Sequence, residues 1–347
     1  MKNIKLAVVG ATGVVGQKMI EVLYEKQLPI DEYVFFASSR SAGKTLRFGD
    51  DIYVVNELNE DSLKDNFSFA LFSAGSETSL KYAPIAVENG CVVIDNSSAF
   101  RMDEKVPLVV PEVNPEDISW HTGIIANPNC STIQAVCALK PLDDAFGIKR
   151  IVYSTYQAVS GAGSKGIHDL EHGIYDYCYN SELDNDVTCS SKNTESYTLE
   201  KFSYPIFNNC LPHIDKFLEN GYTKEEEKMI NETRKILGKP ELLITATTVR
   251  VPVFNSHCES INIEFEKNFE LKNVFEILKN APGVIVKDNI DNEVYAVPTF
   301  VSGHDDVFVS RIRRDFSVKS GLNLWVVADN IRKGAASNAV QILDKLL

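Results

Sequence analysis

A cysteine at the start of a helix is the residue of this sequence with the clearest capacity for chemistry. Cys130 lies in the segment ANPNCSTIQ, and the apolar residues after it recur at helical spacing. At a helix N-terminus, unpaired backbone N–H groups and the positive end of the dipole favour a thiolate, so we expect the pKa of Cys130 to be lowered. Taken alone, the residue is equally compatible with a buried structural cysteine.

A histidine far along the chain is the candidate partner of this thiol. His257 ends the segment VRVPVFNSH, which follows a strand-like run. Imidazole exchanges protons near neutral pH, as the partner of a nucleophilic thiol must. A single histidine after a strand is more often a packed or surface residue, so only the pairing with Cys130 favours a catalytic role.

A glycine-rich turn close to the N-terminus is the candidate cofactor site. The segment GATGVVG, residues 10–16, follows a hydrophobic run and opens a helical pattern. Glycine permits a tight turn and lets backbone N–H groups approach a phosphate at a helix N-terminus. The spacing GxxGxxG differs from GxGxxG, and an ordinary strand–helix turn is the alternative. The candidate contacts are Gly10, Thr12, Gly13, Val14 and Val15.

The next strand ends in a loop whose residue types bear on the choice of cofactor. NAD-selective sites usually place Asp or Glu there to accept from the ribose 2′-OH. This loop reads SSRSAGK, residues 38–44, and has no carboxylate. Hydroxyls and a guanidinium suit a 2′-phosphate, since Arg can offer it two parallel donors. Ser38, Arg40 and Ser41 therefore indicate NADP rather than NAD, with a solvated loop as the alternative.

Together with other segments, these motifs resemble the bacterial, phosphate-dependent aspartate-semialdehyde dehydrogenases. The matching stretches run in order from residue 10 to 339: GATGVVG, SSRSAGK, DNSSAFR, VPEVNP, NPNCSTIQ, YQAVSGAG, GYTKEEEK, VRVPVFNSH and ADNIRKGAASNA. The resemblance implies an NADP-linked aldehyde oxidoreductase that interconverts L-aspartate 4-semialdehyde and phosphate with L-4-aspartyl phosphate. That reaction belongs to the biosynthesis of lysine, methionine, threonine and diaminopimelate. The resemblance also implies a homodimer formed through the catalytic domain.

The resemblance assigns roles around the thiol. Cys130 would form an acyl thioester with the substrate, which suits a soft nucleophile that is also a good leaving group. His257 would be the acid/base, and Gln157 would orient the substrate near the thiol. Arg250 would bind the α-carboxylate through a fork of hydrogen bonds, and Glu225 would accept from the α-ammonium.

Phosphate is implied to bind at Arg101, Lys228 and Asn96. For Lys228 the residues alone favour another interpretation. Glu225 and Lys228 stand three apart in a helix that opens with the capping-box pattern TKEE, and this spacing is typical of a surface ion pair.

Three further residues are implied to contact the cofactor. Ser160 and Gly161, in the segment VSGAG, would let the backbone come close to it. Asn330 would contact the nicotinamide, and a cap at the N-terminus of the terminal helix is the alternative.

Two domains must hold these residues together. In residues 1–129 short apolar runs alternate with helical patterns, which predicts a Rossmann-like, doubly wound parallel sheet that binds NADP. Residues 130–323 contain longer strand-like stretches, which predict an α+β catalytic and dimerisation domain with a mixed or antiparallel sheet, by resemblance of the glyceraldehyde-3-phosphate-dehydrogenase-like type. A terminal helix, residues 324–347, is expected to return to the first domain. Residues 175–197 are polar and Tyr-rich and predict a long surface loop.

Composition excludes several classes of partner. The 347 residues carry 35 Lys plus Arg against 48 Asp plus Glu, a net charge of −13, which argues against binding nucleic acid or an anionic membrane. No apolar run is long enough to cross a bilayer. The 7 cysteines and the histidines lack the spacing of a disulfide framework or a metal site. We therefore expect a reduced, cytoplasmic enzyme without a metal that acts on small molecules.

Two other functions stay open from the sequence. N-acetyl-γ-glutamyl-phosphate reductase shares the thioester chemistry, but its nucleophile typically lies in an NPGCY-like segment, and its acetylated substrate does not need Glu225. A catalytically silent NADP-binding sensor would have little reason to retain Cys130, His257, Gln157 and Arg250 together.

Overall fold

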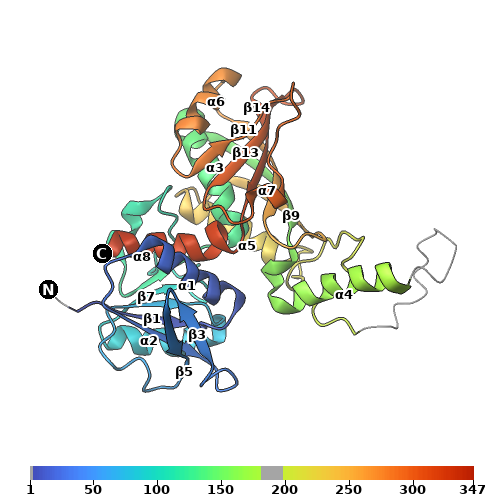
Figure 1. The fold of residues 1–347 in the computed structure, drawn as a ribbon. Coiled ribbons are helices and arrows are strands. Elements are labelled where there is room, and N and C mark those ends of the chain that lie inside the picture. Colours follow the sequence, from blue (N-terminus) through green and yellow to red (C-terminus); the bar gives the residue numbers. More distant parts are fainter. Residues whose placement is uncertain (1–2, 181–197) are drawn as a thin grey trace.

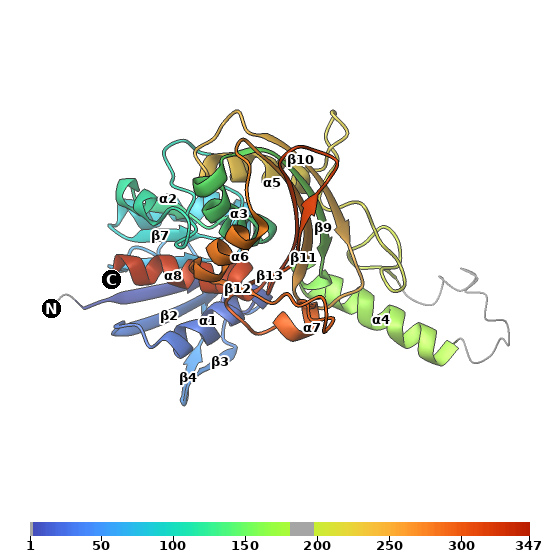
Figure 2. The same cartoon turned by 90° about the horizontal axis from the view of Figure 1, so that it is seen from above.

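The computed structural model describes residues 3–180 and 198–347. Within these ranges two large sheets, each covered by helices, form the body of the molecule, and helix α4 (Ser164–Asn180) projects away from it (Figures 1 and 2). This α/β architecture with a second α+β unit confirms the predicted fold class.

The first sheet is parallel throughout, in the strand order β5-β2-β1-β6-β7-β8. Successive residues of its central strand face opposite sides, so Leu6 and Val8 join one buried cluster while Ala7 and Val9 join another. Both faces are therefore covered, as in a doubly wound sheet. The elements are β1 (Lys5–Val9), α1 (Val14–Lys26), β2 (Glu32–Ala37), the hairpin β3 (Thr45–Phe48) and β4 (Asp51–Val54), β5 (Asn56–Glu57), β6 (Phe69–Phe72), α2 (Ser76–Glu88), β7 (Val92–Asp95), a 3-10 helix (Pro115–Trp120) and β8 (Ile124–Ala126).

The second sheet is mixed, in the order β10-β9-β11-β14-β13-β12. Strands β10 and β9 pair in parallel, as do β12 and β13, and the pairs between them are antiparallel. Its elements are β9 (Ile148–Gln157), β10 (Leu243–Arg250), β11 (His257–Phe265), β12 (Val284–Val286), β13 (Val307–Asp315) and β14 (Gly321–Ala328). Its helices are α3 (Cys130–Phe146), a 3-10 turn (Val159–Ala162), α5 (Lys224–Ile236), α6 (Leu271–Asn280) and α7 (Pro298–Val301).

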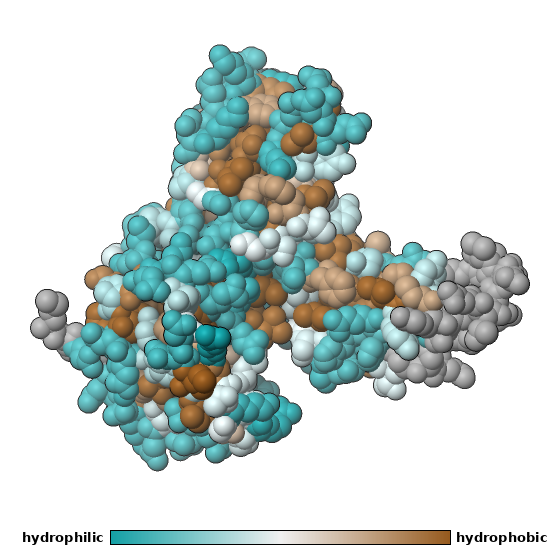
Figure 3. Space-filling view, viewed as in Figure 1, coloured by the Kyte–Doolittle hydropathy of each residue, from teal (hydrophilic) through white to brown (hydrophobic). Residues whose placement is uncertain are grey.

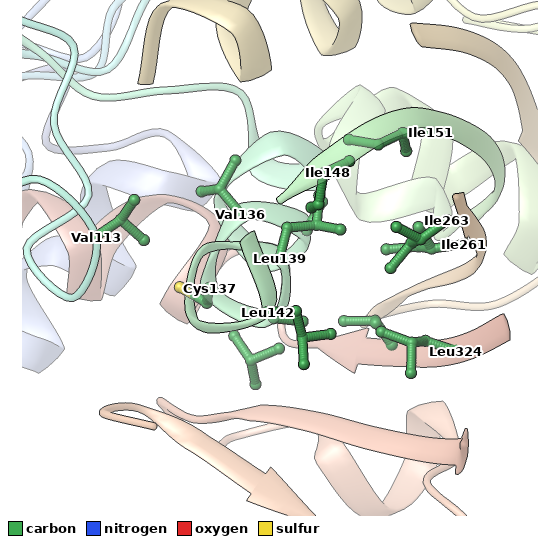
Figure 4. Close-up of a cluster of buried hydrophobic side chains, with 14 of the residues drawn as sticks. Val113, Val136, Cys137, Leu139, Leu142, Ile148, Ile151, Ile261, Ile263 and Leu324 are labelled. Atoms are coloured by element: carbon green, nitrogen blue, oxygen red, sulfur yellow. The ribbon is translucent and has the colours of Figure 1, made fainter. Parts of the chain in front are cut away.

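Helix α3 is the centre of the second core. It packs against α5, α6 and the strands β9, β11, β13 and β14 on the inner face of the curved sheet (Figure 2). Its buried residues contact alternate residues of the strands, as the close-up shows for Val136, Cys137, Leu139, Leu142, Ile148, Ile151, Ile261, Ile263 and Leu324 (Figure 4). Because α3 is buried along its length, its N-terminal residue Cys130 is held rigidly with respect to the sheet.

The C-terminal segment differs in part from the prediction. Residues 321–328 form strand β14 in the middle of the second sheet, and the helical region begins only at a π-helical turn (Arg332–Ala336) that continues into α8 (Ser337–Leu346). A helix starting at residue 324 is therefore wrong, because GLNLWVVA is a buried strand that pairs with a neighbouring strand on each edge. Helix α8 itself packs with α1 against the first sheet, as expected (Figure 1).

The predicted surface loop over residues 175–197 is wrong in its first part. Helix α4 continues to Asn180, and residues 181–197 lie outside the described residues. Ile167, Leu170 and Ile174 recur at helical spacing and pack on a small cluster with Ile206. Within the segment itself, Tyr177 continues this face of the helix and packs on Phe207, with the ring centroids 5.1 Å apart.

The surface is mostly hydrophilic in the view of Figure 3, with hydrophobic residues visible on the lobe that carries the second sheet and along α4. None of the helices in the described ranges combines the length and the apolar character that crossing a membrane requires.

Candidate active site

The candidate site residues of the first domain follow the carboxyl ends of its parallel strands. Gly10 comes directly after β1, Ser38 after β2, Asn96 after β7, and Asn127 after β8. The carboxyl ends of parallel strands meet at one edge of a sheet, which is where ligands bind in open α/β folds. Cys130 follows the last of these strands and therefore lies at the same edge.

The glycine turn has the geometry of a phosphate cradle. Gly10 has φ +86°, and a Cβ added to it would lie 2.5 Å from the carbonyl oxygen of Ser73. Gly13 is the N-cap of α1 and supplies no side-chain cap, and the first helical turn carries no acidic residue. Thr12, Val14 and Val15 complete the turn. The backbone N–H groups at this helix end are therefore open to an anion, which fits the pyrophosphate of a dinucleotide.

The loop after β2 is a tight, exposed turn. The N–H of Ser41 donates to the carbonyl oxygen of Ser38 at 2.8 Å. Arg40 is exposed, and no hydrogen bond or ion pair holds its guanidinium among the described residues. The donors that a 2′-phosphate needs are thus present and unengaged.

Cys130 is the first residue of α3, and Asn129 caps that helix. The Asn129 Oδ1 atom accepts from the N–H groups of Ser131 at 3.0 Å and Thr132 at 3.3 Å. The thiol keeps some access to solvent, but burial, together with the charge of Glu225, raises its pKa to about 12. The expectation of a lowered pKa is wrong, because the protein removes the water around the thiol, and this outweighs the charges of Arg250 and Arg101 and the backbone N–H of Ser131, which act to lower the pKa.

Helix α5 presents a buried carboxylate to this turn. Glu225 accepts from Asn129 Nδ2 at 2.9 Å, from Gln157 Nε2 at 3.3 Å and from Lys228 Nζ at 3.2 Å. Its side chain is 7% exposed, so the interpretation as a plain surface ion pair is wrong. Burial acts to raise the pKa of Glu225, but Lys228, Asn129 and Arg250 outweigh it, and the net shift is downward. Glu225 therefore stays an anion inside the site.

A second carboxylate of α5 had no signal in the sequence analysis. Glu232 is fully buried and binds Arg101 Nη1 at 3.1 Å with one oxygen and the backbone N–H of Asn129 at 2.6 Å with the other. Arg101 also donates from Nε to the carbonyl oxygen of Asn127 and from Nη2 to that of Asn96. The spacing of Glu225 and Glu232, seven residues apart on one helix face, was the signal that could have found it.

Arg250 and His257 meet at the backbone of Ala158. Arg250 Nη1 donates to the Ala158 carbonyl oxygen at 2.6 Å, and the Ala158 N–H donates to His257 Nδ1 at 3.0 Å. Gly161 lies over both side chains: a Cβ added to it would be 3.0 Å from Arg250 Nη1 and 3.2 Å from His257 Nε2. Burial first and the Arg250 charge second hold the pKa of His257 well below its usual range. The ring is therefore neutral at pH 7.

Asn330 joins the other side of this cluster. Its Oδ1 accepts from the N–H of Ser256 at 2.8 Å, and its Nδ2 donates to Ser160 Oγ at 3.1 Å. The helix-cap alternative for Asn330 is wrong, because Asp329 Oδ1 accepts from the N–H groups of Ile331 and Arg332 instead. Asn330 ties the last strand of the second sheet to Ser160.

The C-terminal π-helical turn closes the site from behind. A Cβ added to Gly334 would lie 2.8 Å from the Cβ of Cys130. Asn338 Nδ2 donates to Asn127 Oδ1 at 2.7 Å, and Asn127 Nδ2 donates to Asn96 Oδ1 at 2.7 Å. The return of the chain to the first domain therefore packs directly against the turn that carries the thiol.

The structure thus brings most of the predicted residues into one cluster. The cluster comprises Gln157, Glu225, Lys228, Arg250, His257, Ser160, Gly161 and Asn330, and the charges of Glu225 and Arg250 act on the Cys130 thiol. Arg101 and Asn96 adjoin it through Asn127 and Asn129. The glycine turn and the loop with Ser38, Arg40 and Ser41 lie apart from this cluster on the first domain. Within the two described ranges no group of three His, Cys, Asp or Glu is arranged to hold a metal ion.

Comparison with known proteins agrees with this arrangement. Two family profiles match: the NAD binding domain of semialdehyde dehydrogenases over residues 5–121, and their dimerisation domain over residues 139–333. An aspartate-semialdehyde dehydrogenase of Aquifex aeolicus is 53% identical over 99% of this chain and 98% of its own length. The glycine turn therefore lies in a domain that binds a nicotinamide cofactor.

Two solved structures share the fold. Aspartate semialdehyde dehydrogenase II of Vibrio cholerae complexed with ASA is 46% identical, with a TM-score of 0.91 over 100% of this chain and 98% of its own. The aspartate semialdehyde dehydrogenase of Candida albicans with NADP is 26% identical, with a TM-score of 0.74 over 99% of this chain and 98% of its own. The motifs, the clustered site and these full-length matches agree: the chain is an oxidoreductase that belongs to the aspartate-semialdehyde dehydrogenase family.

Proposed function

We propose that this enzyme reduces L-4-aspartyl phosphate to L-aspartate 4-semialdehyde with NADPH, through an acyl thioester on Cys130. The observation that carries the proposal is that the charges of Glu225 and Arg250 both act on the Cys130 thiol, while hydrogen bonds join Glu225 to Gln157 and, through the backbone of Ala158, Arg250 to His257. The product would supply the biosynthesis of lysine, methionine, threonine and diaminopimelate.

The charges of the cluster complement the ends of this substrate. Arg250 Nε is buried and has no hydrogen-bond partner within the described residues, so it can form a fork with the α-carboxylate. Glu225, which stays ionised, can accept from the α-ammonium. An acetylated substrate has no ammonium to donate to Glu225. This buried carboxylate therefore argues against N-acetyl-γ-glutamyl-phosphate reductase activity.

Phosphate binding is proposed at Arg101 and Lys228, with Asn96 beside them. Both cations are already held by carboxylates, Arg101 by Glu232 and Lys228 by Glu225 and Asp215. A local site of this kind lets a protein of net charge −13 bind an anion, because the cations are fixed in place and partly desolvated.

The cofactor is proposed to be NADP. Gly10, Thr12, Gly13, Val14 and Val15 would hold its pyrophosphate, and Ser38, Arg40 and Ser41 its 2′-phosphate. Ser160, Gly161 and Asn330 would lie beside the nicotinamide. When bound, the cofactor supplies the hydride that converts the thioester to the aldehyde. The related Candida albicans structure with NADP supports this choice.

A homodimer is proposed to form on the outer face of the second sheet. Helices α3, α5 and α6 cover the inner face, whereas the outer face carries the short helix α7 and exposes Tyr156, Trp325 and Tyr295, where the rings of Tyr156 and Trp325 pack 5.5 Å apart. The match to a dimerisation domain over residues 139–333 supports this. The six described cysteines are free thiols, as expected for a working location in the reducing cytoplasm.

One assay tests the proposed function. NADP⁺ reduction is followed with L-aspartate 4-semialdehyde, with and without inorganic phosphate, and N-acetyl-glutamate semialdehyde serves as the comparison substrate. We expect turnover that requires phosphate and prefers the free amino substrate. Absence of phosphate-dependent turnover by the native enzyme would contradict the proposal.

A further inference from the structure

A buried carboxyl group of strand β11 has no part in the substrate contacts proposed above. Glu259 has no exposed surface, and neither of its side-chain oxygens has a hydrogen-bond partner among the described residues. An ionised carboxylate without a donor or water is very costly in a protein interior. The protein must therefore supply a cation for Glu259 or keep it uncharged.

Glu259 lies in a row of residues that crosses the inner face of the second sheet. In the register of the strands its neighbours are Thr155 on β9 and Val326 on β14, and Thr155 pairs in turn with Thr248 on β10. All four residues are fully buried. Because side chains alternate along a strand, Glu259 shares its face of β11 with Ile261, which belongs to the core around α3 (Figure 4).

The side chain of Gln134, on α3, faces this carboxyl group. Its amide acts on Glu259 as a donor without closing a hydrogen bond to it, and its Nε2 donates to the backbone carbonyl oxygen of His257 at 3.4 Å. Its Oε1 is buried and has no hydrogen-bond partner in the described ranges. Three buried acceptor oxygens, two of Glu259 and one of Gln134, therefore lack a donor.

A single proton on Glu259 satisfies all three oxygens. The O–H of a protonated carboxyl group can donate to Gln134 Oε1, while its other oxygen accepts from Gln134 Nε2. Nε2 carries two hydrogens, so the amide keeps its bond to the His257 carbonyl oxygen. An ionised Glu259 would instead leave Gln134 Oε1 without a donor.

The charged groups around Glu259 also favour the uncharged form. Burial is the main cause that holds the pKa of Glu259 well above its ordinary range, and the Glu225 charge on α5 acts in the same direction. Arg250, on β10, donates to the Ala158 carbonyl oxygen rather than to Glu259. Burial also shifts the pKa of the other titratable groups on the packed elements toward the neutral form: His257 and Cys258 on β11, Tyr153 on β9 and Cys130 on α3. No cation is therefore paired with Glu259 in the part of the chain that the structure describes.

A bond between these two side chains would join the helix of the nucleophile to the sheet. Gln134 follows Cys130 by four residues, so the two lie one turn apart on the same face of α3. Glu259 follows His257 by two residues on the same face of β11. Pairing of Gln134 with Glu259 therefore fixes the first turn of α3, and with it Cys130, against β11.

We propose that Glu259 is a protonated, uncharged carboxyl group that pairs with the Gln134 amide, and that this pair is a positioning element for Cys130. Neither residue touches the reacting atoms in this role. The protonation and the pairing do not rest on the proposed function, whereas the effect on turnover does.

Infrared spectroscopy of the full-length enzyme tests the protonation without substrate. A protonated carboxyl group absorbs above the amide bands, where ionised carboxylates do not. At about pH 8 exposed carboxyl groups are ionised, so we expect a band in this region that shifts on ¹³C labelling of glutamate and is missing from Glu259→Gln. Absence of such a band from the native enzyme would overturn the proposal.

Turnover of two variants tests the positioning role. The amide of Glu259→Gln offers Gln134 the same donor and acceptor as the protonated acid, so kcat should stay within about threefold of the native value. Glu259→Met has a similar length but cannot pair, and kcat should fall by about ten- to a hundredfold while KM for phosphate changes by less than about twofold. Expressing kcat per mole of bound NADPH leaves unfolded protein out of the comparison. Equal kcat values in the two variants would contradict the positioning role.

A double-mutant cycle tests whether Glu259 acts through Gln134. Gln134→Met alone should lose about as much kcat as Glu259→Met, and the double variant should lose no more than about twofold beyond either, because each change removes the same pair. Losses that multiply in the double variant would overturn the pairing. Lack of turnover by the native enzyme would count against the proposed substrate alone, since the infrared result needs no substrate.

Discussion

Two helices begin at the same edge of the first sheet. The N-terminus of one has no side-chain cap, and the N-terminus of the other is capped by an Asn side chain. Helix α1 follows β1 through Gly10 and Gly13, which offer no side-chain cap. Helix α3 follows β8 through Asn129, whose amide caps two N–H groups and which is itself bound by Glu225 and Glu232. One end is open and suited to an anion, while the other is filled by protein groups.

The difference shows that a helix N-terminus stabilises an anion beside it only where its backbone N–H groups are free to donate to that anion. At α1 the donors have no acid or cap nearby, so a phosphate can bind. At α3 burial of the thiol and the charge of Glu225 outweigh that advantage, and the pKa of Cys130 rises to about 12. In the free enzyme, burial therefore favours the protonated thiol of Cys130.

The largest expected effect separates chemistry at α3 from binding at α1. Cys130→Ala removes the atom that forms the thioester, so turnover should fall by about 10⁴-fold or more. The cofactor contacts at α1 are untouched, so the dissociation constant for NADPH, measured by fluorescence titration, should change by less than about twofold. Substantial turnover in the variant would disprove the thioester mechanism.

A change at the N-terminus of α1 should weaken binding of the cofactor and leave the chemistry of Cys130 unchanged. Gly10→Ala places a Cβ 2.5 Å from a backbone oxygen at a φ of +86°, so the turn must deform, and NADPH affinity should fall by about 10²-fold. Alkylation of Cys130 should be unaffected.

The matched control for Gly10→Ala is Gly90→Ala. Gly90 has φ +80° but nothing within 4 Å of an added Cβ, so it carries the backbone strain without the collision. It should lose about 1 kcal/mol of stability and keep its affinity for NADPH. Equal losses of affinity in both variants would contradict the phosphate cradle.

Removing the Asn129 cap should leave free backbone N–H groups at the N-terminus of α3, as at the N-terminus of α1. Asn129→Ala frees the N–H groups of Ser131 and Thr132, which lowers the pKa of Cys130 toward its ordinary value. In the native enzyme the raised pKa means that the alkylation rate climbs about tenfold per pH unit up to at least about pH 10. In Asn129→Ala, alkylation near pH 8 should be several-fold faster, and its rise with pH should level off earlier.

The unfolding free energy of Asn129→Ala is measured as well, so that a second variant with a similar loss of stability can serve as the control. Loss of the cap should cost about 1–2 kcal/mol of unfolding free energy, measured with urea. Thr223→Ala removes the matching capping box of α5 and should cost a similar amount while leaving the alkylation profile of Cys130 nearly unchanged. A pKa of Cys130 that stays the same in Asn129→Ala would mean that burial alone sets it.

The smallest expected effect concerns the loop beside the α1 end. Arg40→Ala removes an exposed guanidinium that is engaged by no other described residue, so NADPH binding should weaken by about tenfold while NADH binding stays the same. The ratio of kcat/KM values for the two cofactors measures this. An equal loss with both would place Arg40 at the shared part of the cofactor.

The sequence was most informative where the signal is local. The short apolar runs of residues 1–129 predicted a parallel sheet, and the strands Lys5–Val9 and Val92–Asp95 are such runs, because short buried parallel strands are continuous apolar segments. The capping box at Thr223 predicted the start of α5 correctly. Strand β14 was mistaken for part of a helix, because GLNLWVVA is almost wholly apolar and lacks the alternation of an edge strand.

The residue types at the site, and hence the family, could be read from the sequence by itself, since Cys130, His257, Arg250 and the glycine turn lie in short, specific motifs. Only the tertiary structure decided their protonation. Burial and the charges of Glu225, Arg250 and Arg101 act on Cys130 from segments far apart in the sequence, and the backbone N–H of Ala158 donates to Nδ1 of His257. Desolvation and hydrogen-bond direction depend on what is nearby in space, which no local pattern of residues records.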